Sequence, residues 1–134
     1  MLAPAFPGPT EPEFRLLYLG NDIKLIAALR QVLAEPVYRL VTCSDRDSAV
    51  LFLKSDIPYE VLLVDFEWRK MDGVGVVRIA RKLRHRRLMP IVLVGGARLS
   101  RQTRADAEEA GVTMCVLKTQ DVWEVIRRLI DRET

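Results

Sequence analysis

The residues best placed for chemistry in this chain follow its apolar runs. Asp65 ends the run that begins at Val61, and Lys118 follows the run 113–117. If these runs are parallel strands of one sheet, their carboxyl ends meet at one edge, where α/β proteins bind their ligands. A carboxylate and an amine brought together there form a salt bridge. The crevice around them is therefore the first candidate site.

Two further groups belong to the same predicted edge. Gly20, Asn21 and Asp22 follow the first apolar run, and Asp22 is also a good cap for the helix expected after it. Gly95 and Gly96 follow the fourth run, where successive backbone N–H groups could form an anion-binding nest for a small ligand. Because no acid–base pair is evident in the sequence, we do not expect an enzyme.

The elements that must position these residues alternate regularly from residue 14 onward. Five apolar runs alternate with five helical patterns, which predicts a parallel sheet with right-handed crossovers and helices on both faces. We therefore expect a flavodoxin-like, doubly wound α/β fold with strand order 2-1-3-4-5. The expected strands are 15–19, 37–43, 60–65, 90–94 and 113–117, and the expected helices are 23–35, 44–54, 73–88, 101–110 and 122 onward.

Several residues mark the expected helix ends. Ser100 and Asp121 can cap helices, and Gly111 suits the left-handed position that ends one. Ser44 and Asp47 have the spacing of a capping box. Six basic residues gather at the end of the third expected helix, where cations complement the helix dipole. They are Arg81, Lys82, Arg84, His85, Arg86 and Arg87.

Composition limits the class of protein. Residues 1–13 hold four of the seven prolines, which predicts a flexible tail and a single domain over residues 14–134. A hydrophobic fraction of 49% and a charged fraction of 29% exclude a disordered chain. No run approaches the ~20 apolar residues of a membrane span, so we expect no membrane role. Cys43 and Cys115 lack metal-ligand spacing, and a cytoplasmic location is expected.

The net charge of +3 conceals an uneven distribution of charge. Residues 69–104 contain eleven Lys and Arg residues but only one acid, Asp72. Such a segment favours an acidic partner. Direct binding of nucleic acid is less favoured, because no aromatic side chains that could stack on bases lie among these cations.

Two segments of the chain resemble the receiver domain of two-component response regulators, a CheY-like fold. The first is Val61–Asp65 followed by Met71-Asp72-Gly73, and the second is Gly111–Lys118. The resemblance covers about residues 14–132. It implies that Asp65 is a candidate phosphoacceptor, that Lys118 contacts the phosphate, and that acidic residues hold Mg²⁺ nearby.

The sequence departs from that pattern at the metal and switch positions. The family's acidic pair falls on Gly20 and Asn21, which leaves Asp22 and, after the third strand, Glu67 as nearby acids. Gly95 replaces the switch Thr or Ser, and Cys115 stands where an aromatic residue is common. No cofactor is therefore assured, and any Mg²⁺ binding should be weak. Asp65 with Lys118 is then either a phosphoacceptor site or a structural salt bridge.

Three functions remain open. The first is an atypical receiver, with weak or absent phosphorylation, that acts through contacts with a histidine kinase, an output domain or a target protein. The second is a conventional receiver phosphorylated at Asp65, and the third is a small ligand-binding module. By resemblance, the face formed by the fourth helix, fifth strand and fifth helix could bind a partner or a second copy. Its candidate residues are Arg101, Arg104, Trp123 and Arg127.

Overall fold

The computed structural model describes residues 14–66, 73–96 and 99–133, which form a five-stranded parallel sheet. The strand order is β2-β1-β3-β4-β5, so the predicted fold class and strand order are confirmed. Residues 1–13, predicted to be a tail, lie outside the described residues. The strands are β1 (Phe14–Leu19), β2 (Tyr38–Cys43), β3 (Val61–Asp65), β4 (Ile91–Gly95) and β5 (Met114–Leu117).

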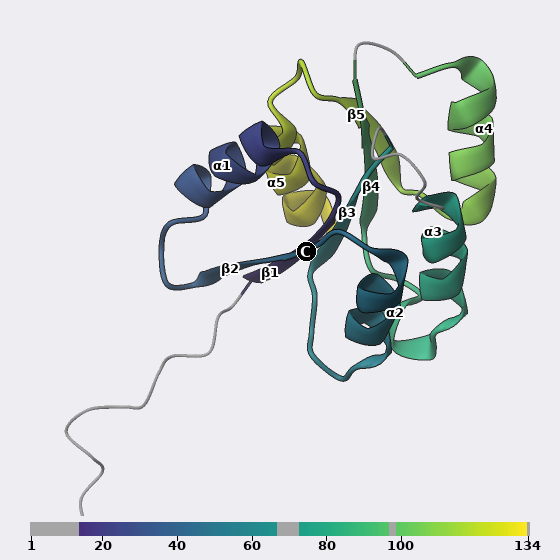
Figure 1. The fold of residues 1–134 in the computed structure, drawn as a ribbon, viewed down its shortest axis with the longest axis horizontal. Helices are drawn as coiled ribbons and strands as arrows, with labels where there is room; N and C mark the ends of the chain where they lie inside the picture. The colour runs from purple at the N-terminus through teal and green to yellow at the C-terminus, as the bar shows by residue number, and fades with distance from the viewer. Residues whose placement is uncertain (1–13, 67–72, 97–98, 134) are drawn as a thin grey trace, which may run out of the picture.

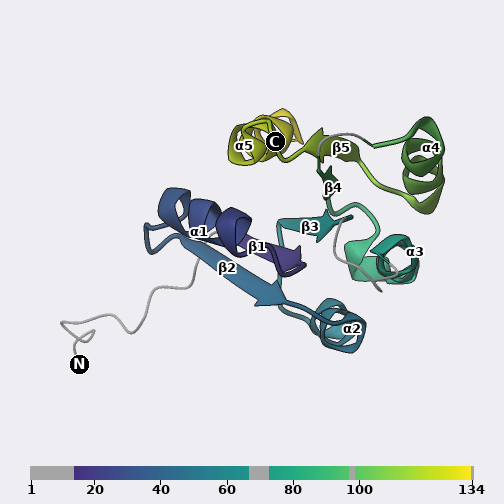
Figure 2. The ribbon, with the colours of Figure 1, turned by 45° about the horizontal axis from the view of Figure 1, so that its top comes forward.

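The helices cover both faces of this sheet, as Figures 1 and 2 show. Helices α1 and α5 lie on one face, and helices α2, α3 and α4 lie on the other. Each face therefore has its own apolar core. The helices are α1 (Ile23–Val32), α2 (Arg46–Lys54), α3 (Gly73–Lys82), α4 (Arg101–Ala110) and α5 (Val122–Glu133), with a short 3₁₀ helix η1 (Arg84–Arg86) after α3.

The alternation of side chains along β1 decides what reaches the candidate site. Leu17 and Leu19 pack on the side of α2, α3 and α4, whereas Leu16 and Tyr18 pack on the side of α1 and α5. Successive side chains of a strand point to opposite faces, and both faces of a parallel sheet are covered. Tyr18 is consequently fully buried, although it carries a polar hydroxyl.

The helix ends mostly follow the predicted capping residues. Asp22 Oδ1 accepts hydrogen bonds from the N–H groups of Lys24 and Leu25, at 3.0 and 3.1 Å. Ser100 caps α4 through the N–H of Thr103. Gly111 ends α4 with a φ of 115°, a left-handed conformation that favours glycine.

Three boundary predictions were wrong. Helix α1 ends at Val32 and does not continue to residue 35, because Leu33 leaves the helical conformation with a φ of −101° and a ψ of 36°. Asp45, not Ser44, caps α2, because the Asp45 carboxylate accepts the N–H of Ser48 at 2.7 Å and no capping box forms. Helix α3 ends at Lys82 and does not continue to residue 88, because Leu83 takes an extended conformation before η1.

The basic residues after α3 also differ from the simple prediction of cations at a helix end. Arg86 is 3% exposed and donates hydrogen bonds to the carbonyls of Leu53, Ser55 and Ile57, where α2 ends. Those carbonyls have no partner inside α2, and a buried guanidinium satisfies several of them at once. Arg86 therefore joins η1 to the end of α2.

The described residues contain no helix with both the length and the apolar character needed to cross a membrane.

Candidate functional site

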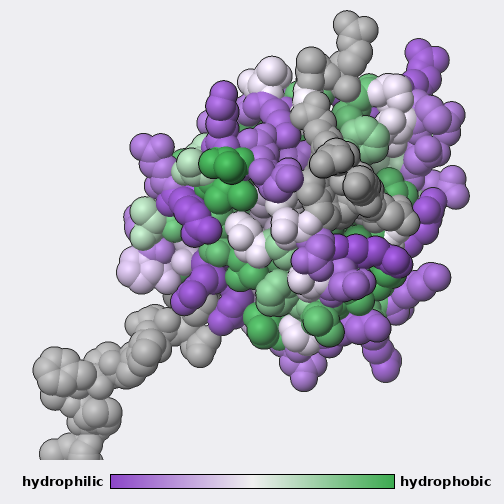
Figure 3. All heavy atoms as spheres, viewed as in Figure 1, coloured by the Kyte–Doolittle hydropathy of each residue, from purple (hydrophilic) through white to green (hydrophobic). Residues whose placement is uncertain are grey.

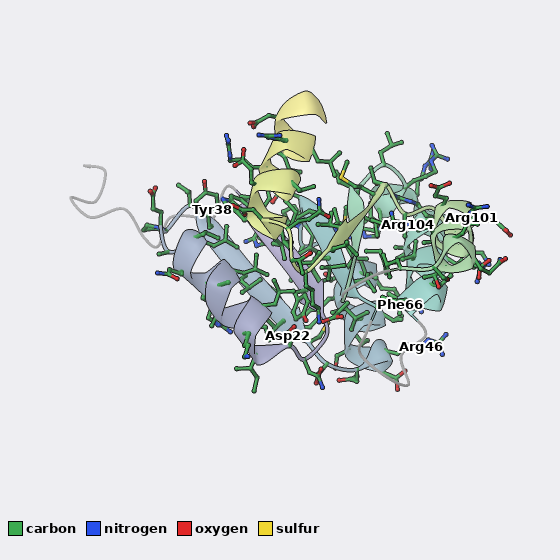
Figure 4. All side chains as sticks on the ribbon, turned by 90° about the horizontal axis from the view of Figure 1, so that it is seen from above. Asp22, Tyr38, Arg46, Phe66, Arg101 and Arg104 are labelled. Atoms are coloured by element: carbon green, nitrogen blue, oxygen red, sulfur yellow. The ribbon has the colours of Figure 1, made fainter. Side chains whose placement is uncertain are left out.

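The candidate site lies at the carboxyl edge of the sheet, where β1, β3 and β5 end. Lys118 Nζ lies 2.9 Å from Asp65 Oδ2 and 2.8 Å from Asp22 Oδ2. The amine thus stands between two carboxylates that come from the end of β3 and the start of α1. Asp22 serves both this ion pair and the helix cap, and Figure 4 shows it at the amino end of α1.

Tyr18 is a member of this site that the sequence analysis missed. Its hydroxyl donates a hydrogen bond to Asp65 Oδ2 at 2.8 Å and accepts one from the N–H of Asp22 at 3.2 Å. A buried tyrosine hydroxyl normally requires such partners. The sequence did contain one signal for this role, because Tyr18 is the only polar side chain among the four residues that end this strand, and the other three are leucines.

The electrostatics fix the protonation of two of these groups. Burial, together with the hydrogen bond to Asp65, raises the pKa of Tyr18 far above its usual value, so the phenol stays neutral and remains a donor. The hydrogen bond from Lys118 is the main cause that lowers the pKa of Asp22, so its carboxylate is charged at neutral pH. Asp65 itself is only 1% exposed.

Gly20 and Asn21 stand at the two positions where the resemblance places an acidic pair. Gly20 is buried, and a Cβ atom added to it would lie 2.5 Å from Tyr18 Oη and 2.7 Å from Asp65 Cβ. Real Cβ atoms do not approach other atoms so closely, so the Tyr18 hydroxyl occupies the space that a side chain at position 20 would need. Asn21 is exposed.

The described residues do not fit a magnesium ion. Mg²⁺ requires a nearly octahedral set of oxygen ligands. Here the Lys118 ammonium lies between Asp22 and Asp65, the position in which a cation would neutralise both carboxylates. No group of three or more His, Cys, Asp or Glu side chains within residues 14–66, 73–96 and 99–133 could hold a metal. Glu67 and the Met71-Asp72 part of the motif lie outside the described residues.

Gly95, at the switch position, also lies against a side chain that fills the space beside it. A Cβ atom on Gly95 would collide with the side chain of Leu99, which is buried after β4. The space beside Gly95 therefore belongs to Leu99, and the Gly95–Gly96 crevice expected for a small ligand is partly covered. Cys115 is partly buried on β5, and burial raises the pKa of its thiol.

The four candidate partner residues do not form one surface. Arg101 and Arg104 are exposed in the first turn of α4. Trp123 instead packs edge-to-face against Phe14 and Tyr38, and Figure 4 shows Tyr38 at the opposite end of the molecule from the two arginines. Arg127 forms an ion pair with Glu124 on α5.

Comparisons with known proteins agree on the architecture. No protein-family model and no curated protein sequence matches the chain. A receiver domain of a sensor histidine kinase from Pseudomonas aeruginosa, solved with a magnesium ion in its active-site cleft, matches with a TM-score of 0.70 and 22% identity. The match covers 89% of this chain and 95% of that chain.

Two further solved structures give the same result. A CheY-like receiver domain from Methanospirillum hungatei matches with a TM-score of 0.75 and 20% identity over 89% of this chain and 94% of that one. A response regulator from Burkholderia pseudomallei with a phosphorylated aspartic acid matches with a TM-score of 0.69 and 15% identity. This match covers 84% of this chain and 64% of that one. The protein therefore has the fold of the response regulator receiver domains.

Proposed function

We infer that this chain is an atypical receiver module of two-component signalling, which acts through protein contacts and not through metal-dependent phosphorylation of Asp65. One observation carries the proposal. The Oδ2 atom of Asp65 is held by both the Tyr18 hydroxyl and the Lys118 amine, in a carboxylate that is 1% exposed. Phosphoryl transfer requires a carboxylate oxygen that a donor can approach in line.

The balance of charge supports the same proposal. The Lys118 ammonium neutralises part of the charge of Asp22 and Asp65, as a bound metal ion would. A metal ion would have to displace this amine and find further oxygen ligands near Gly20, where the Tyr18 hydroxyl leaves no room for a carboxylate side chain. The partner is then a histidine kinase, an output domain or a target protein that recognises the surface of the module.

A conventional receiver remains the second candidate, and one contact favours it. Lys118 lies 2.9 Å from Asp65, close enough to contact a phosphoryl group on that carboxylate. Phosphorylation would then require Tyr18 to release Asp65.

The two candidates differ in the outcome of phosphorylation. The chain is incubated with acetyl phosphate and Mg²⁺, and its intact mass is measured beside a conventional receiver domain treated identically. We expect the conventional domain to gain a phosphoryl group and this chain to gain none. One phosphoryl group per chain, absent from the variant Asp65→Asn, would establish the conventional receiver instead.

A magnesium titration tests the site without a phosphoryl donor. NMR amide shifts of Tyr18, Asp65 and Lys118 report on the crevice, and amides of α4 serve as the internal control. We expect no saturable change at the three crevice amides. A saturable change confined to them would show that magnesium does enter and would contradict the proposal.

A further inference from the structure

Four cations within residues 78–87 have no ion-pair partner in the described part of the chain. Arg78 and Lys82 are exposed on α3, and Arg84 and Arg87 are exposed in and just after η1. We call these four residues the α3–η1 cationic surface. Figure 3 shows hydrophilic side chains along the edge of the molecule that α3 and α4 form.

Two arginines of the same basic run have a structural role and are not part of this surface. Arg81 Nε donates to the carbonyl of Gly111 at 2.9 Å, and Arg81 Nη1 donates to that of Met89 at 2.6 Å. Arg86 holds the end of α2, as described above. These buried and half-buried contacts fix α3 and η1 to their neighbours, so the four exposed cations project from a rigid support.

The fold gains little stability from the four exposed cations, because only Lys82 lies in the last turn of α3, where a cation complements the helix dipole. Arg78 and Lys82 are four residues apart on one helix, a spacing at which like charges repel each other. Residues 73–90 contain no Asp or Glu, so no acid within this segment offsets the repulsion. A set of unpaired cations on a rigid support is suited to an anionic partner.

We propose that the α3–η1 cationic surface, together with Leu88, binds an acidic segment of a partner protein. Leu88 follows Arg87 and is 86% exposed, so an apolar side chain stands beside the cations. An apolar anchor with surrounding charge suits a peptide that carries both acidic and apolar residues.

Nucleic acid fits this surface less well. Residues 73–90 contain no Phe, Tyr or Trp to stack on bases and no Asn or Gln to pair with adenine, so only the cations of this surface could contact nucleic acid. The ring of His85 is also engaged, because its Nε2 lies 2.9 Å from the carbonyl oxygen of Ser55.

The inference rests on the proposed function, because it names the contact surface of a module that acts by binding.

The test measures binding of a fluorescent peptide composed of glutamate and leucine, by anisotropy. The variant Arg78→Gln/Lys82→Gln/Arg84→Gln removes three charges from the surface, and Lys24→Gln/Arg30→Gln/Arg39→Gln removes three exposed cations from α1 and β2. We expect the first variant to bind about tenfold more weakly and the second to stay within about twofold of the parent. Equal weakening in both variants would overturn the proposal, because it would show attraction by net charge alone.

Leu88→Ser tests the apolar anchor at constant charge. We expect it to weaken peptide binding by about threefold to tenfold. Binding of a duplex DNA more tightly than the peptide, at the same salt concentration, would assign the surface to nucleic acid and overturn the proposal. Circular dichroism confirms that each variant is folded. Because no assay here uses a phosphoryl donor, failure of this inference and failure of the proposed function are read from separate experiments.

Discussion

At the scale of single residues, the Oδ2 atom of Asp65 decides the character of the crevice. This oxygen accepts a hydrogen bond from the neutral phenol of Tyr18 at 2.8 Å and lies 2.9 Å from the ammonium of Lys118. A buried carboxylate is costly unless such partners satisfy it, and removing one of them leaves a charge that is poorly compensated. Tyr18 and Lys118 therefore stabilise the fold as well as close the site.

Replacement of Tyr18 by Phe removes the hydroxyl and keeps the ring. Asp65 then loses a donor and the N–H of Asp22 loses an acceptor, so we expect the free energy of unfolding to fall by about 1–3 kcal/mol. Urea denaturation measures the change. Tyr59→Phe is the matched control, because Tyr59 is buried but its hydroxyl has no hydrogen-bond partner in the described part of the chain. An equal loss in both variants would contradict this account of Asp65.

Replacement of Gly20 by Ala tests the space that the Tyr18 hydroxyl fills. The new methyl group would lie 2.5 Å from Tyr18 Oη, so we expect a loss of about 1–3 kcal/mol from overpacking. The same substitution in a Tyr18→Phe background should cost less, because the nearest atom, Oη, is gone, although Asp65 Cβ and the ring carbon Cζ remain 2.7 Å from the new methyl group. Four urea denaturation curves complete this double-mutant cycle. Strictly additive losses would show that the two positions do not share this space.

At the scale of elements, Arg86 shows how one side chain can complete a helix from outside it. The last carbonyls of an α-helix lack partners within the helix, and here a guanidinium from η1 supplies donors to Leu53 and to the residues that follow α2. The same guanidinium lies 5.0 Å from the centre of the Tyr59 ring. The end of α2 therefore depends on η1.

Arg86→Met keeps the apolar stem of the side chain and removes its donors. We expect the free energy of unfolding to fall by about 2–3 kcal/mol, because the buried carbonyl of Leu53 and the half-buried contacts to Ser55 and Ile57 lose a charged donor. Arg84→Met, two positions earlier and exposed, should change stability by less than about 0.5 kcal/mol. Hydrogen exchange at the end of α2 should accelerate only in Arg86→Met. A similar loss in both variants would disprove the assigned role.

The elements could be predicted from the sequence because their signals are local. Consecutive apolar residues marked β3 and β4, and Ser100, Gly111 and Asp22 marked helix ends through their own side chains or backbone. The errors arose where two local signals competed, as with Ser44 and Asp45. They also arose where a distant carbonyl attracted a cation, as at Arg86.

The candidate site was predictable only in outline. The ends of β3 and β5 meet through topology, which the alternation of elements predicts, so Asp65 and Lys118 were found together. The roles of Tyr18 and Leu99 depend on side chains that fill the space beside a nearby glycine, Gly20 and Gly95 respectively. No periodicity in the sequence records such a contact, because it depends on the backbone conformation at the strand end and, for Tyr18, on a hydrogen bond to Asp65 far along the chain.

At the scale of the whole molecule, the groups whose pKa differs between the folded and unfolded chain make stability depend on pH. The folded-state pKa of Asp22 is lowered, chiefly by Lys118, so its contribution is present above its unfolded value of 3.8 and is lost as pH falls. Burial raises the pKa of Cys43 from 9.0 to about 12 and that of Tyr18 further above its usual value. Their contributions are present below the unfolded values and are lost as pH rises.

The free energy of unfolding should therefore be nearly constant around neutral pH and should fall below about pH 4 and above about pH 9. Urea denaturation across pH 2–11 (roughly the practical range) measures the profile. Asp22→Asn retains a capping side chain but removes the charge, so it should flatten part of the acid limb. Cys43→Ala should move the onset of the alkaline limb upward. A profile unchanged in both variants would exclude these groups as its cause.

The ion pairs of Lys118 join a late part of the chain to two earlier parts. Asp22 and Asp65 leave the ribosome before Lys118 does, so a nascent chain that has emerged only through β4 carries both acids without the amine that joins them. The two carboxylates gain their shared ammonium only when β5 and the lysine that follows it have been translated. The last strand of the chain thus brings the group that joins the first and third strands at this edge of the sheet.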